Sequence, residues 1–290
     1  MKNATLYKTD EIVSRTNLEF HFDQVPKYWF GEDPFKTRFF DALGLSFPDG
    51  EKFFIQSVKA FRDKVTDPKL LTDISVFIKQ EAQHGIIHNL MNENLKKQNI
   101  PVKRLMGVLK NSLNYNKSLE FNLAVTVAYE YVTALLAQCL FEDRQVFAEA
   151  DPRMQALWIW HSIEEMEHRE VAFNVMKQVG NVDEEMRVIA FRKTFSLIFD
   201  SALGVANIML RCDGFSNNER KLMLDKGKDW LFGPKGIMTT KMPLILDSLK
   251  EDFHPSHYPI INHYDVWMKA IEETNDPIYA ANKFWEAGLK

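Results

Sequence analysis

Apolar residues recur every three or four positions along most of this chain, which is the pattern of amphipathic and buried helices. Two of these stretches open with Asp-Pro, at Asp67-Pro68 and Asp151-Pro152. In each, the aspartate can cap a helix whose first position is the proline. We find no strand-like alternation, no internal repeat and no long linker in the sequence. The expected fold is therefore all-α, a single domain of residues 1–290 built around a helical bundle.

The expected elements fall into three parts. Residues 1–47 combine prolines and glycines with dense aromatic residues, and we expect an irregular segment that wraps the body. Asp49 is expected to cap the first helix of a four-helix core over residues 49–180, and residues 183–290 should add helices and a lid containing the loop FHPSHYP. The predicted helices span about 50–64, 68–97, 102–113, 118–148, 152–180, 183–211, 216–231 and 234–250, with a last short helix after Asp276-Pro277.

The stretch HSIEEMEH, from His161 to His168, carries the most informative pattern in the chain. At about 100° per residue, His161, Glu165 and His168 fall in one stripe on one helix face. Burying such groups without partners costs several kcal/mol each, whereas a bound metal compensates them. The helix predicted over 68–97 carries a matching Glu-x-x-His in Glu81 and His84, on a face that also holds apolar residues. The two motifs together predict a metal site between two helices.

Two Glu-x-x-His motifs and one lone glutamate on each of two further helices form the arrangement of di-iron or di-manganese sites in four-helix bundles. Glu130 lies in an apolar run, and its alternative is a buried protonated glutamate. Glu51 shares its face with Phe54, and its alternative is a first-turn glutamate favoured by the helix dipole. The expected metal ligands are Glu51, Glu81, His84, Glu130, His161, Glu165 and His168.

Further residues lie beside this set. His88 is expected to support a ligand or to form a cavity wall, and Glu164 to orient a histidine, whereas Glu167 is expected to face solvent. Small residues near Glu130 either leave room for a substrate or allow close helix packing; these are Thr126, Thr133, Ala134 and Ala137.

The motifs FPDGEKFF, QEAQHGIIH, HSIEEMEHREVAFNV and the late FHP resemble, in this order over roughly residues 40–260, a family of predicted metal-dependent hydrolases of ferritin-like fold. The His-x-x-x-Glu-x-x-His spacing also resembles that of the di-iron p-aminobenzoate N-oxygenases, in which an extra histidine joins the usual ligands. The resemblance implies a ferritin-like four-helix bundle with extra C-terminal helices. It also implies the same seven ligands, with His161 as the extra histidine.

The composition indicates which class of protein and which cellular compartment to expect. A net charge of −4 and a pI near 6.1 lack the basic footprint of a nucleic-acid-binding protein. Cys139 and Cys212 are far apart in apolar segments, and we interpret them as free buried thiols of a reducing compartment. The stretch MKNATLYKTD has no apolar run of a signal peptide, so we expect a cytoplasmic protein. Residues 188–210 are interpreted as a buried helix and not a transmembrane segment, and the apolar excess is compatible with a homo-oligomer.

The main functional expectation is an oxidoreductase. Two iron ions would activate O₂ and oxidise a small apolar or aromatic organic substrate, with electrons from an unidentified donor. The pair would be Fe/Fe, with Mn/Fe or another divalent pair as alternatives. A metal-dependent hydrolase with a dinuclear site is the second hypothesis, and a non-enzymatic metal-binding bundle is the third. All three share the same residues, so metal identity and O₂ consumption distinguish them.

Overall fold

A computed structural model describes residues 12–113, 118–257 and 262–288. Within these residues the chain is all-α, with one isolated bridge between Phe30 and Ala150 in place of any strand. The long helices are α1 (Pro34–Lys59), α2 (Pro68–Lys97), α4 (Leu119–Glu142), α5 (Pro152–His168) and α7 (Glu184–Cys212). The shorter helices are α3 (Val102–Leu113), α6 (Val171–Val179), α8 (Asn217–Phe232), α9 (Met242–Asp247), α10 (Tyr264–Thr274) and α11 (Pro277–Gly288).

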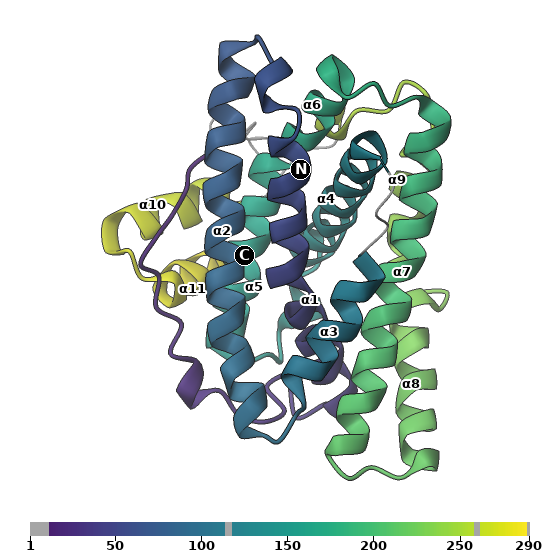
Figure 1. The fold of residues 1–290 in the computed structure, drawn as a ribbon. Coiled ribbons are helices and arrows are strands. Elements are labelled where there is room, and N and C mark those ends of the chain that lie inside the picture. The colour runs from purple at the N-terminus through teal and green to yellow at the C-terminus, as the bar shows by residue number, and fades with distance from the viewer. Residues whose placement is uncertain (1–11, 114–117, 258–261, 289–290) are drawn as a thin grey trace.

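Helices α1, α2, α4 and α5 pack against one another around the middle of the molecule (Figure 1). Helices α7 and α8 cover one side of this group, and α10 and α11 cover the opposite side, where α11 packs on α5 (Figure 1). The segment of residues 12–33 runs along the outside of α2 and reaches the end of α10, where Asn275 Nδ2 donates to the Asn17 carbonyl oxygen. The N-terminal segment of the described chain therefore lies beside α2, and its C-terminal helix α11 lies beside α5.

Helix α1 begins much earlier than the sequence pattern predicted. The expected start at Asp49 is wrong, because Asp33 caps the helix through the Lys36 amide and Pro34 takes the first turn. Pro48 lies inside the helix, although an internal proline removes one hydrogen bond and costs about 3 kcal/mol. Fifteen α1 residues are buried, most of them with apolar side chains, which offsets this cost. Glu51 therefore lies deep inside α1, so its alternative as a first-turn glutamate no longer applies.

Three other boundaries differ from the predictions. Helix α4 ends at Glu142, because Asp143 adopts an extended conformation and caps a short 3₁₀ turn. The helix predicted over 152–180 is interrupted at Arg169 and Glu170, so His168 is the last residue of α5. Residues 234–250 form only a 3₁₀ turn and α9, and α10 was not predicted. The errors at α4 and α5 arise where a local cap or break interrupts an apolar pattern that continues past it. Helix α10, in contrast, is a whole helix that the pattern did not predict.

Helices α4 and α7 are each long and apolar enough to cross a membrane, judged by length and composition alone. In α4, 78% of the most apolar window is buried inside the molecule, as in the core helix of a bundle. In α7 the buried share of that window is only 39%. The expectation of a buried helix over 188–210 is thus met on one face of α7, the face that packs on α1 and α4.

Candidate metal centre

The seven predicted ligands converge from all four core helices, and each is at most 4% exposed. Helix α1 contributes one carboxylate, α4 another, α2 a Glu-x-x-His pair, and α5 the remaining three donors. Their side-chain oxygen and nitrogen atoms form overlapping groups in which all atoms lie within 4.8 Å of one another. These groups are Glu81/Glu130/His168, Glu51/Glu81/His84, His84/His161/Glu165 and Glu51/His88/His161.

The closest approaches join imidazole nitrogens to carboxylate oxygens. His168 Nε2 lies 3.1 Å from Glu130 Oε2 and 3.2 Å from Glu81 Oε1. His161 Nε2 lies 3.1 Å from Glu165 Oε1. Glu165 Oε1 is also 3.6 Å from His168 Nε2, so this carboxylate lies between the two histidines of its own helix. About one helix turn separates each of these three donors from the next, so the i, i+4 and i, i+3 spacing places them on one face.

The atoms that face the middle of this cluster have no hydrogen-bond partner among the described residues. Buried polar groups are normally paired, and leaving one unpaired costs about 1–3 kcal/mol. A cluster of this size without partners is the expected state of a cation site. The atoms are both carboxylate oxygens of Glu51, Glu81 and Glu130, His84 Nδ1, His161 Nε2 and His168 Nε2.

The pKa values of these buried groups also indicate a cation site. Burial raises the pKa of Glu130 to about 8, with a further rise from the neighbouring Glu81. Burial also raises the pKa of Glu51 and of Glu81 above the ordinary range, and it lowers the pKa of His161 to about 4. Without a cation these carboxyls hold protons more readily than exposed carboxyls do. Four carboxylates would balance two divalent cations, so the donor set fits a dinuclear site.

The outer nitrogen of His84 is held by a buried ion pair. His84 Nε2 donates to Glu164 Oε2 at 3.1 Å, and Arg15 Nη1 and Trp160 Nε1 both donate to Glu164 Oε1 at 2.9 Å. Burial alone would raise the pKa of Glu164, but the bond from His84 and the charge of Arg15 hold it below the ordinary range. His84 Nδ1 faces the cluster, which is the orientation of a metal ligand. Burial lowers the pKa of His84, but the neighbouring Glu164 and Glu81 hold it well above its ordinary value, so a bound metal would take the place of the Nδ1 proton.

The outer nitrogen of His168 is held by an amide. His168 Nδ1 donates to Gln80 Oε1 at 3.0 Å, and Gln80 Nε2 donates to Glu167 Oε2 at 2.8 Å. Arg15 Nη2 donates to Glu167 Oε1 at 2.7 Å, and the Tyr264 hydroxyl from α10 donates to the same oxygen. The expectation that Glu167 faces solvent was wrong. It is 5% exposed, because residues 12–33 and α10 cover this side of α5.

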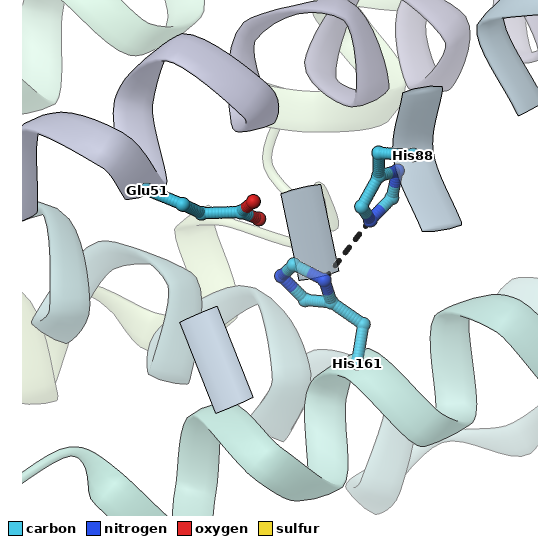
Figure 2. Close-up of side chains that lie close together, drawn as sticks. All are labelled: Glu51, His88 and His161. Atoms are coloured by element: carbon cyan, nitrogen blue, oxygen red, sulfur yellow. Dashed lines mark hydrogen bonds between the residues drawn. The ribbon is translucent and has the colours of Figure 1, made fainter. Parts of the chain in front are cut away.

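His161, the other histidine of α5, has a different neighbour. Figure 2 shows Glu51, His88 and His161 pointing toward one another from α1, α2 and α5, with His88 Nε2 and His161 Nδ1 joined at 3.0 Å. His88 Nδ1 has no partner among the described residues. Phe47 stacks on the His161 ring at 4.6 Å between centroids, and Trp158 packs beside His88. This side of the cluster is therefore mainly apolar.

An apolar cavity adjoins this side, and His161 and Glu165 form part of its wall. Thr133 and Ala137 also line it. Thr126 and Ala134 are buried, but they line neither this cavity nor a second one between α1, α3, α4 and α7. The Thr133 hydroxyl donates to Glu165 Oε2. Of the four small residues singled out in the sequence, two thus lie where a substrate could approach the donors.

Sequence reasoning missed Arg15, Gln80 and Tyr264. Arg15 is separated from Glu164 by 149 positions, and no helical spacing connects it to the site. Gln80 directly precedes Glu81 on α2, so a search for amides beside the Glu-x-x-His motif could have found it. Cys212 was expected to be buried and is exposed, because it is the last residue of α7, whereas Cys139 is buried in the cavity wall.

Four carboxylates and three imidazoles are buried between the helices of this all-α bundle. This arrangement is typical of metal-binding helical bundles. The chain belongs to the family of predicted metal-dependent hydrolases, whose model matches residues 14–258. No curated protein and no solved structure matches the chain at a significant level. The ferritin-like fold and the likeness to the N-oxygenases accordingly stay predictions.

Proposed function

We propose that this protein is a metal-dependent hydrolase whose dinuclear centre is held by Glu51, Glu81, His84, Glu130, His161, Glu165 and His168. One observation carries the proposal: His161 and Glu165 belong both to the donor cluster and to the wall of an apolar cavity. A substrate in that cavity would touch the centre directly. The description of the family as predicted metal-dependent hydrolases supports hydrolysis as the reaction.

When bound, two divalent cations would supply Lewis acidity and lower the pKa of a water molecule toward neutrality. The residues of the chain position and shield the reacting groups. Thr133 holds Glu165 by donating to its Oε2, which leaves Oε1 facing His161 and His168. Phe47 and Trp158 pack around His161 and limit the access of bulk water. A substrate that enters this side of the site would therefore have few water molecules to displace.

An O₂-dependent oxidoreductase with two irons, or with a Mn/Fe pair, is the second candidate. The observation that favours it is the donor set, because four glutamates with histidines between bundle helices are typical of di-iron and di-manganese proteins.

The cavity wall also bears on the substrate of the proposed hydrolase. The residues that line the adjoining cavity include no lysine or arginine to bind a phosphoryl group. A hydrolase of this kind would accordingly act on an uncharged ester or amide.

The deciding experiment measures metal content and both reactions on one preparation. The purified protein is stripped of metal, loaded separately with Zn²⁺, Mn²⁺ or Fe²⁺ without oxygen, and assayed for ester and amide hydrolysis and for O₂ consumption. We expect two metals per chain and hydrolysis that falls at least about a hundredfold in Glu165→Gln. The exposed Glu93→Gln is the matched control.

The outcomes separate the candidates. O₂ consumption by the Fe²⁺-loaded protein, without hydrolysis by any loaded form, would transfer the proposal to the oxidoreductase. Fewer than one metal per chain after reconstitution would exclude both.

A further inference from the structure

The cavity beside His161 and Glu165 has a neighbour of similar size. We call the first the proximal cavity and the second the distal cavity, and each leaves a free volume of about 40 Å³. The distal cavity lies between α1, α3, α4 and α7 and has no candidate metal ligand in its wall. Apolar protein interiors are normally packed to crystal-like density, and each of these two apolar spaces has more room than one water molecule needs, so a slender apolar occupant fits them.

The two cavities lie side by side and share part of their walls. Leu43, Phe47, Thr133 and Leu136 line both of them. Along α1 the lining residues run from Phe40 in the proximal cavity to Phe54 in the distal cavity, a helical rise of about 21 Å. The combined space is therefore elongated and follows the direction of the core helices, with the candidate metal ligands at its proximal part.

The lining is uniform in chemistry along most of this length. Among the residues that line the two cavities, none is lysine, arginine or aspartate, and the distal wall is formed mainly by leucine, isoleucine and phenylalanine. Its polar groups are hydroxyls, including those of Ser46 and Ser201. The charged or metal-binding groups are His161 and Glu165, both in the proximal wall. An occupant would thus be apolar along its length and polar only beside the metal centre.

We propose that the two cavities together hold one unbranched aliphatic chain, an acyl or alkyl group. Its polar head would lie beside His161 and Glu165, and its tail would extend past Phe47 and Leu136 toward α7. A compact aromatic molecule fits the shape less well, because it would fill one cavity and leave the other empty. The assignment of the head as the reacting group rests on the proposed function, whereas binding of the chain does not.

Chain-length dependence tests the proposal directly. The metal-loaded protein is titrated calorimetrically with a saturated fatty acid series from hexanoate to hexadecanoate, with naphthoate as the compact aromatic probe. Each methylene buried in an apolar wall should tighten binding by about fourfold, until the chain exceeds the combined length. Equal affinity along the series, or tighter binding of naphthoate than of every fatty acid, would overturn the proposal.

A matched pair of variants on α7 tests which cavity holds the tail. Ser201 lines the distal cavity and is partly buried, whereas Ser196 on the same helix is exposed. Ser201→Phe should abolish the gain for the longer acids and leave hexanoate binding unchanged, and Ser196→Phe should behave as the unmodified protein. If Ser201→Phe does not fold, Leu197→Trp narrows the same cavity from a partly buried position. Longer acids that bind equally well to either filled variant would overturn the proposal.

The orientation has its own measurement. With Mn²⁺ in the centre, the carbon-13 signal of a carboxyl-labelled tetradecanoate should relax faster than that of the methyl-labelled acid, because the head lies nearer the paramagnetic ion. The reverse order would overturn the assignment of head and tail. Chain binding without any hydrolysis of the matching esters would refute the proposed function alone. Hydrolysis with no preference for chain length would refute this inference alone.

Discussion

The candidate metal centre has two unlike sides. On the Arg15 side, the outer nitrogens of His84 and His168 are held by a network in which one guanidinium serves both Glu164 and Glu167. On the Phe47 side, His161 is supported by a single contact with His88, among aromatic rings and next to the cavity. A charged network limits how far ligands can move, whereas an apolar wall leaves space for a substrate. We infer that one side anchors the metals and the other admits the substrate.

The strongest test of this contrast removes the guanidinium. Arg15→Met should lose most bound metal and about 3–5 kcal/mol of unfolding free energy, because two buried glutamates lose their counter-charge. Metal content by mass spectrometry and urea unfolding measure the two effects. Arg153→Met is the control; its partly exposed pair with Asp151 should contribute at most about 1 kcal/mol. Equal behaviour of the two variants would refute an anchoring network.

A smaller effect is expected when the amide is removed. Gln80→Leu deprives His168 Nδ1 of its acceptor, so metal affinity should fall about 10–100-fold, the usual effect of losing such a partner. Competition with a coloured chelator measures this affinity. Gln83→Leu, a partly buried glutamine on the same helix, is the control. Unchanged affinity in Gln80→Leu would mean that the contact with Gln80 does not orient His168 for metal binding.

On the Phe47 side, His88→Leu should weaken metal binding by less than about tenfold. Burial lowers the pKa of His88 well below its ordinary value, and its outer nitrogen has no partner among the described residues, so it can hold His161 only loosely. Two metals per chain should remain, and the exposed His257→Leu is the control. Loss of one metal per chain would instead identify His88 as a ligand, as its place in the group with Glu51 and His161 allows.

The smallest effect concerns the two thiols. Burial raises the pKa of Cys139 in the proximal wall to about 12, so at pH 8 its thiol stays protonated and unreactive, and reactivity should rise only toward pH 12. A disulfide reagent at pH 8 should therefore label one thiol per folded chain, the exposed Cys212, and none in Cys212→Ser. Fast labelling of both thiols would mean that the proximal cavity is open to water-soluble reagents.

The sequence patterns predicted the all-α class, because helical periodicity and Asp-Pro starts are local signals. The start of α1 was missed, although Asp33-Pro34 carries the same signal as Asp67-Pro68. Residues 1–47 were expected to be irregular, but α1 continues through Pro48, because buried apolar contacts offset the cost of a proline inside a helix. The grouping of the five donors on α2 and α5 could be anticipated because neighbouring donors lie at i, i+3 or i, i+4. Glu51 and Glu130, each alone on its helix, were anticipated from the donor pattern of four-helix metal sites.

By itself, the sequence determined which donor types are present and which of them share a helix face, since helix geometry relates spacing to direction over one or two turns. Only the tertiary structure decided that Glu167 is buried, that Arg15 joins Glu164 to Glu167, and that the two cavities share Phe47 in their walls. These contacts join residues far apart in the chain. They depend on how whole helices pack, and packing is set by the summed burial of many side chains and not by any local spacing.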